Sequence, residues 1–160
     1  MLKITLITVG ALSEAHWKDA AAEYTKRISG SARLDDVCLK DEKLSSDPSD
    51  SEIRRALDAE AERIISAIPK RAFVVPLCVE GRQVSSESLA GKIDAAATAG
   101  YGDICFIIGS SYGLSDRVKS LANFKLSLSS LTFPHQMAKV VLLEAIYRSL
   151  SILSGSKYHK

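Results

Sequence analysis

The stretch Leu126-Ser-Leu-Ser-Ser-Leu-Thr-Phe-Pro-His-Gln136 decides how this chain is organised. Its alternating leucines and serines predict a short strand over Phe124–Leu128, and the hydroxyl-rich residues that follow predict a loop. Pro134 suits the first position of a helix, because its missing N–H has no partner there and its φ is already helical. Such a loop can hold a heterocycle by its hydrogen-bonding edge. A well-capped strand-to-helix turn is the plainer interpretation.

The helix predicted from Pro134 to about Leu153 is apolar on almost every side. Its apolar residues are Met137, Val140, Val141, Leu142, Leu143, Ala145, Ile146, Tyr147, Leu150, Ile152 and Leu153. A helix of this kind needs two covering surfaces. The sheet of its own chain supplies one, and a second subunit would supply the other. The sequence therefore predicts a homodimer that packs partly through this helix.

Upstream of this stretch, predicted strands and helices alternate. Apolar, β-branched runs predict strands at Lys3–Val9, Arg33–Lys40, Ala72–Val79 and Asp103–Ile108. Helices are predicted between them, with candidate caps at Ser13, Ser49, Ser85 or Ser86, and Ser115. This alternation predicts an α/β fold, a three-layer sandwich with a mostly parallel sheet. With 160 residues and no long linker or repeat, a single domain over residues 1–160 is expected.

Ligands of such folds sit beyond the carboxyl ends of the strands, where the sequence places three loops: Leu77–Gly81, Gly109–Gly113 and Leu128–Pro134. Pro76 cannot donate to a ladder, so its strand should leave the sheet there, with Glu80-Gly81 in a loop. The middle loop lacks the lysine of a phosphate-binding loop and the spacing of a dinucleotide fingerprint. Its first glycine allows close backbone approach to a ligand, or simply makes a turn.

Charge is unevenly distributed along the chain. Residues 1–113 carry 14 Lys or Arg against 17 Asp or Glu, whereas residues 114–160 carry seven against two. A basic C-terminal third favours a phosphate-bearing partner, and an ordinary charged surface is the alternative. The tail Gly155–Lys160 combines charge with Tyr158 and His159, which suits stacking on a base, or it is a frayed terminus.

Several classes of function are disfavoured. No metal site is expected, because the histidines and cysteines show no paired ligand spacing (His16, His135, His159, Cys38, Cys78, Cys105). The three cysteines lie in predicted strands as small core residues, which fits a reducing, cytoplasmic compartment. Neither a signal peptide nor a membrane-spanning run is expected. A serine hydrolase built from Ser110 or Ser111, His135 and Asp116 would lack the usual G-x-S-x-G elbow.

Five motifs, taken in order, resemble one known family along the whole chain. They are Ile4-Thr-Leu-Ile-Thr-Val-Gly10, Ile107-Ile-Gly-Ser-Ser-Tyr-Gly-Leu-Ser115, the Leu126–Gln136 stretch, Leu142-Leu-Glu-Ala-Ile-Tyr-Arg148 and the closing Tyr158-His159. The chain resembles the RlmH (YbeA-like) family, small members of the SPOUT class of RNA methyltransferases. It departs from the family at Ser110, where a second glycine is usual, and at Ala145, where Gln is common.

The resemblance implies a C-terminal trefoil knot, with the knotted cofactor-binding part at about residues 72–160. The cofactor would be S-adenosylmethionine, and the family is homodimeric. Its members methylate N3 of a pseudouridine in the helix 69 stem-loop of 23S rRNA in the assembled ribosome. By matching motif positions, the cofactor-binding residues would be Leu77, Gly109, Leu128, Ser129, Ser130, Leu131, Thr132 and Phe133.

The resemblance also suggests residues on the substrate side. The sulfonium methyl is already electrophilic, so the protein must align the reactants and ease loss of the N3 proton. His159, Tyr158 and His135, from the same or the other subunit, are candidates to accept that proton. Arg148 is a candidate anchor for phosphate or for the substrate base. A non-catalytic RNA- or nucleotide-binding α/β module would look much the same in sequence.

Overall fold

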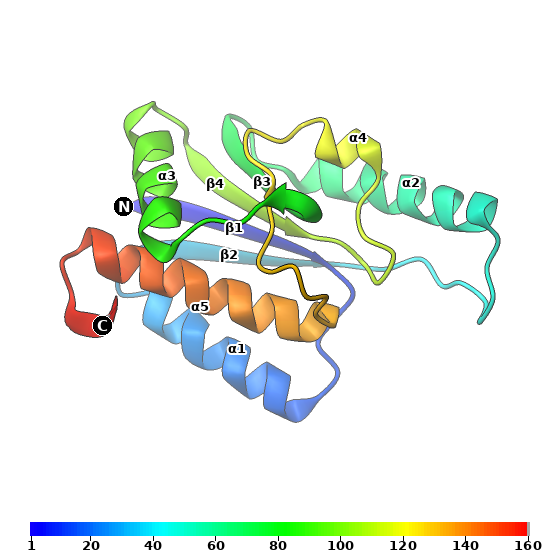
Figure 1. Ribbon diagram of the computed structural model, residues 1–160, viewed down its shortest axis with the longest axis horizontal. Coiled ribbons are helices and arrows are strands. Elements are labelled where there is room, and N and C mark those ends of the chain that lie inside the picture. Colours follow the sequence, from blue (N-terminus) through cyan, green and yellow to red (C-terminus); the bar gives the residue numbers. More distant parts are fainter. Residues whose placement is uncertain (160) are drawn as a thin grey trace.

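The computed structural model describes residues 1–159, and of His159 it describes the backbone alone. Its centre is a parallel sheet of four strands in the order β2-β1-β4-β3 (Figure 1). The strands are β1 (Leu2–Val9), β2 (Ala32–Leu39), β3 (Ala72–Arg82) and β4 (Asp103–Ile108). Central β4 is buried along its whole length, as its nearly unbroken apolar sequence predicts.

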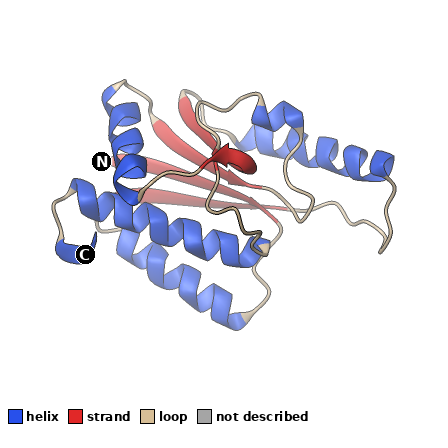
Figure 2. Ribbon diagram, in the orientation of Figure 1, coloured by secondary structure: helices blue, strands red, loops and turns tan. Residues whose placement is uncertain are grey.

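Helices cover both faces of the sheet (Figure 2). One face carries α1 (Ala15–Ile28), α3 (Ser86–Thr98) and α5 (His135–Leu153), and the other carries α2 (Asp50–Ala67) and α4 (Asp116–Lys119). Each face has its own buried cluster, one around Phe106 and Leu142 and one around Ile107 and Ile64. The prediction of a three-layer α/β sandwich is confirmed. A short 3-10 helix, Lys157–His159, ends the described chain.

The second half of β3 leaves the sheet. Pairing between β3 and β4 ends at Pro76, opposite Ile107, as expected of a residue without an N–H. Beyond it the strand curls away from the sheet edge (Figure 1). The predicted loop at Glu80-Gly81 is wrong, because β3 stays extended to Arg82 by pairing with another segment: the Arg82 N–H donates to the Lys125 carbonyl at 3.0 Å.

The predicted fifth strand at Phe124–Leu128 is also wrong. Only Leu126 makes strand-like bridges, with Leu77 and Arg82. The hydroxyls of the stretch explain the early end of pairing: the Ser127 Oγ donates to the Ser129 carbonyl at 3.0 Å, and the Leu131 N–H donates to the Ser129 Oγ at 3.0 Å. Such local side-chain bonds offer the backbone an alternative to a ladder.

The helix starts were predicted with mixed success. Ser49 forms the expected capping box with Glu52, and the Ser85 hydroxyl caps α3. Pro134 is the N-cap of α5 and not its first helical residue. The start of α1 is held from a distance, because the Gln136 Oε1 accepts from the Ser13 N–H at 2.9 Å. That bond ties the first turn of α5 to the residue just before Glu14, the N-cap of α1.

Helix α5 finds both of its covering surfaces within one chain. Leu142, Leu143 and Ile146 are fully buried, and α5 packs against both α1 and α3. The apolar character of α5 therefore does not by itself require a second subunit, and the homodimer stays a prediction. Within residues 1–159, no helix has the length and apolar character needed to cross a membrane.

Candidate functional site

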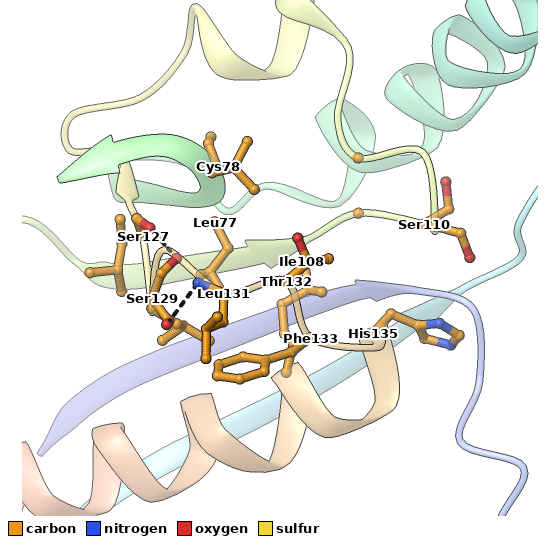
Figure 3. A pocket seen from close by; sticks show the side chains of 17 residues that line it. Leu77, Cys78, Ile108, Ser110, Ser127, Ser129, Leu131, Thr132, Phe133 and His135 are labelled. Atoms are coloured by element: carbon orange, nitrogen blue, oxygen red, sulfur yellow. Dashed lines mark hydrogen bonds between the residues drawn. The ribbon is translucent and has the colours of Figure 1, made fainter. Parts of the chain in front are cut away.

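The three predicted edge loops meet around one pocket (Figure 3). It lies where β4 ends, where β3 bends away, and where the 127–134 segment enters α5. Its walls are mainly apolar, with serine and threonine hydroxyls and backbone groups between them. The lining residues are Leu77, Cys78, Val79, Ile108, Gly109, Ser110, Ser111, Gly113, Leu126, Ser127, Leu128, Ser129, Leu131, Thr132, Phe133, His135 and Ala138.

Most of the residues predicted to bind a cofactor line this pocket: Leu77, Gly109, Leu128, Ser129, Leu131, Thr132 and Phe133. Ser130 does not. Its Oγ is 3.0 Å from the Gln83 Nε2, which donates to it from the chain just after β3. Ser130 therefore links the 128–134 loop to Gln83 and does not face the pocket.

Sequence reasoning missed part of the lining. Ile108, Leu126 and Ser127 lie just before the predicted loops, and Ala138 lies one turn into α5. The signal for Ala138 is its spacing, because a residue three positions after His135 lies on the same helix face. For Leu126 the sequence signal is the alternation of leucine and serine, which puts Leu126 on the same side of the chain as Leu128 in the pocket wall.

Gly109 is required by the geometry of the loop. A Cβ built on it would lie 2.3 Å from the Gly113 carbonyl oxygen and 2.9 Å from the Leu114 Cδ2. Gly113, which has a φ of +87°, is held in this position because its N–H donates to the Ser110 carbonyl at 2.8 Å. The loop thus folds back onto Gly109, and no side chain fits there.

Ser110 occupies the position where the resemblance leads one to expect a second glycine. Its hydroxyl donates to the Glu60 Oε1 at 2.7 Å. Glu60 lies on α2, is 3% exposed, and also accepts from the Glu42 N–H at 2.9 Å. The serine is thus accommodated by a buried carboxylate. The sequence alone gave no sign of Glu60, because its partners are 18 and 50 residues away.

We expect Ser110→Ala to destabilise the fold. The substitution leaves a buried carboxylate oxygen without its donor, which costs about 1–3 kcal/mol. Ser111→Ala, at the exposed neighbouring position, is the matched control and should stay within about 0.5 kcal/mol of the wild type. Urea unfolding of the three proteins measures the difference. Equal free energies of unfolding for the two variants would show that the Ser110–Glu60 bond contributes nothing.

His135 lies at the wall of the pocket at the start of α5 (Figure 3). A Cβ on Gly10, at the end of β1, would be 3.5 Å from the His135 Nε2. The serine hydrolase that the sequence disfavours gains no support from Ser110, because its hydroxyl is directed to Glu60. His135 itself is one of the residues that line the pocket.

The cysteines offer no thiolate chemistry at this pocket. Burial raises the pKa of the Cys78 thiol, and the Glu80 carboxylate adds to the effect. Burial likewise raises the pKa of Cys105 to about 12. Both thiols are protonated at neutral pH. Cys38 is exposed on β2, which corrects the prediction that all three cysteines lie in the core. Across the described residues, no group of His, Cys, Asp and Glu side chains is arranged to hold a metal ion.

Arg148 and Tyr158, predicted for the substrate side, contact each other near the end of α5. The Arg148 guanidinium lies 4.9 Å from the centre of the Tyr158 ring and pairs with Glu144 at 2.6 Å. Desolvation raises the pKa of the Tyr158 phenol, with a hydrogen bond to Tyr24 as the next cause. The raised pKa keeps the Tyr158 phenol protonated at neutral pH. The side chain of His159 lies outside the described residues.

One chain does not bring these residues to the pocket. Arg148 follows His135 by 13 residues of continuous helix, so the two are separated along α5 by about 20 Å. The structure thus divides the predicted site into a pocket at the start of α5 and an aromatic and cationic cluster at its end.

The basic C-terminal third is largely neutralised in the fold. Arg117 pairs with Glu62, Lys119 with Glu80, Lys139 with Asp36 and Arg148 with Glu144. Three of these four carboxylates come from the acidic first part of the chain. Four of the seven Lys and Arg residues of positions 114–160 are thus paired with carboxylates.

Comparison with known proteins agrees with this geometry. A family model described as a predicted SPOUT methyltransferase matches residues 2–159. A putative ribosomal RNA large subunit methyltransferase H of Methanococcus maripaludis is 48% identical over 159 residues, which cover 99% of this chain and 100% of the relative. The ribosomal RNA large subunit methyltransferase H of Bacillus pumilus is 46% identical with the same coverage.

Among solved structures, a probable methyltransferase from Bordetella pertussis superposes with a TM-score of 0.58. The match covers 93% of this chain and 95% of that one at 13% identity, which concerns the fold alone. Sequence and fold point the same way: the chain belongs to the RlmH family of SPOUT methyltransferases.

Proposed function

We propose that this protein uses S-adenosylmethionine to methylate N3 of a pseudouridine in the helix 69 stem-loop of 23S rRNA in the assembled ribosome. The observation that carries the proposal is the pocket, because seven of the eight residues expected to bind the cofactor line it. Membership of a methyltransferase family and relatives named for ribosomal RNA support the reaction class and the type of substrate.

The residues of the pocket fit such a cofactor. Leu77, Leu128 and Phe133 offer apolar walls for an adenine ring, and the loop around them offers hydroxyls and backbone groups for its edge. Gly109 keeps one wall free of a side chain. When bound, the cofactor supplies a methyl group on a positively charged sulfur, which makes it electrophilic.

The work left to the protein is to place the base and to remove its proton. N3 of the base must lose its hydrogen to attack, and proximity and alignment supply much of the rate. His135 lies at the pocket. Arg148 lies about 20 Å from His135 along α5 of the same chain, and Tyr158 contacts Arg148, so we propose that Arg148, Tyr158 and His159 reach the pocket from the second subunit of a homodimer. The trefoil knot and a cytoplasmic location belong to the same proposal.

Methyl transfer is the direct test. The protein and S-adenosylmethionine are incubated with assembled ribosomes that lack the modification, and with free 23S rRNA as a control. Nucleoside mass spectrometry then identifies the product. Methylated pseudouridine from ribosomes alone supports the reaction, the target nucleoside and the need for the assembled ribosome. Cofactor binding without product on any RNA would contradict it and favour a non-catalytic nucleotide- or RNA-binding module.

Ribosome binding is expected to depend steeply on salt. Each neutralised phosphate releases counterions, so four contacts would weaken binding by about 100-fold between 50 and 200 mM salt. Binding of fluorescently labelled protein to ribosomes over that range measures the slope. A flat response would contradict recognition through phosphates.

A further inference from the structure

The bent end of β3 fixes two cations beside the pocket. The Arg82 N–H donates to the Lys125 carbonyl, and the Ser127 N–H donates to the Arg82 carbonyl, both at 3.0 Å. The contact is tight, because a Cβ on Gly81 would lie 2.7 Å from the Leu126 carbonyl carbon. Leu126 and Ser127 line the pocket. The main chain of Arg82 and of Lys125 is therefore held next to the pocket wall, and both residues are exposed.

A third cation reaches the same place from α3. The Lys92 Nζ lies 4.3 Å from the centre of the Phe124 ring, a cation–π contact with the residue next to Lys125. Phe124 is buried, with 9% of its surface exposed, so its ring is a fixed contact surface for Lys92. Arg82, Lys92 and Lys125 thus lie near one another although they come from three segments distant in sequence. We call these three residues the cationic rim.

The charges of the rim are not neutralised by the protein. Within residues 1–158, none of the three forms an ion pair, whereas the neighbouring Lys119 pairs with Glu80 at 2.7 Å. Arg82 and Lys125 also border a surface hollow whose other walls are Glu80, Gly81, Ala122, Asn123 and Phe124. Since Lys119 offsets the one carboxylate of this hollow, the rim keeps its positive charge.

We propose that the cationic rim binds the phosphates of the RNA backbone next to the nucleotide that enters the pocket. The inference rests on the proposed function, because it takes RNA as the substrate. An arginine can hold a phosphate through two parallel hydrogen bonds, and a lysine acts as a point charge with long reach. Phosphate contacts position a nucleic acid without reading its sequence. Contacts of this kind next to the pocket would hold the RNA backbone while the pocket selects one nucleotide.

Other cations without an ion pair among the described side chains, such as Arg54 and Lys70, are exposed near the start and just beyond the end of α2. The rim differs from them because main-chain bonds join it to the pocket wall. This difference supplies a matched control. Arg82→Ala/Lys125→Ala and Arg54→Ala/Lys70→Ala remove the same residue types and the same charge. The first pair lies beside the pocket, and the second pair, called the α2 variant, lies in α2 and just beyond its end.

The experiment measures binding of wild type and both double variants to unmodified ribosomes and to a labelled single-stranded oligouridylate, between 50 and 200 mM salt. For two lost phosphate contacts on a single strand, the salt slope of the rim variant should fall by about 1.4, and affinity at 50 mM by roughly tenfold or more. Calorimetry should show unchanged affinity for S-adenosylmethionine. Arg82→Lys should keep most of the slope, and the α2 variant should match the wild type.

The outcomes separate this inference from the proposed function. If wild type methylates ribosomes and both double variants keep its affinity and slope, the rim assignment is overturned while the function stands. If wild type methylates no RNA but the rim variant alone loses RNA affinity, the rim stands and the proposed substrate fails. Absence of any RNA binding overturns both. An equal loss of cofactor affinity in the rim variant would mean that the substitutions disturb the pocket wall, and would overturn the assignment.

Discussion

Gly109→Ala should weaken cofactor binding by as much as about 100-fold. The new Cβ would lie 2.3 Å from the Gly113 carbonyl oxygen and 2.6 Å from its carbonyl carbon. Both atoms are main chain, and the turn that holds them is closed by the bond from Gly113 N–H to the Ser110 carbonyl. The clash can therefore be relieved only if the main chain of the 109–113 loop shifts. Overpacking of this kind costs about 1–3 kcal/mol, which corresponds to as much as about 100-fold in affinity if all of it falls on the pocket.

Calorimetry with S-adenosylmethionine and with its demethylated product measures this loss. Gly91→Ala is the matched control, because nothing lies within 4 Å of a Cβ at Gly91 and the position is in the middle of α3. That variant should bind the cofactor as the wild type does and gain slightly in helix stability. If Gly109→Ala kept wild-type affinity while remaining folded, the 109–113 loop would not be part of the cofactor site.

The sequence predicted the frame of this site because its signals are local. Runs such as Asp103–Ile108 specify buried strands by composition, and parallel strands place their following loops at one edge. Three loops chosen in this way meet in one pocket. The cap at Ser49 and the break at Pro76 are also local effects of single residues, and the structure confirms both.

The failures share a different cause, which is contact between residues far apart in the sequence. Glu80-Gly81 stays extended because it meets the segment around Leu126, and the start of α1 is held by Gln136. Ser110 depends on Glu60, and Lys139 is neutralised by Asp36. No period or motif encodes such pairs. The residue-by-residue pattern therefore gave the position of the pocket but not the bonds that fix its walls.

Deleting residues 157–160 should abolish methyl transfer and leave cofactor binding unchanged. Tyr158 contacts Arg148, which lies about 20 Å along α5 from the pocket residue His135 of the same chain, so the pocket of that chain does not need Tyr158. The deletion removes Tyr158, which packs against Tyr147 and Arg148. We expect at least a roughly 100-fold fall in kcat, the size typical of losing a positioned proton-transfer group, with an unchanged Kd for S-adenosylmethionine. Loss of both activities, or of neither, would contradict the division of the site.

Mixed dimers then decide from which chain the tail acts. Gly109→Ala chains have a defective pocket and an intact tail, whereas chains lacking residues 157–160 have the reverse. Each variant alone should be inactive. If the tail serves the pocket of its partner, mixing them in equal amounts restores one complete site in half of the dimers, or about a quarter of wild-type activity. If the tail serves its own pocket, no mixed dimer contains a complete site. Activity that stays at zero, with mixed dimers verified by mass spectrometry, would refute the two-chain site.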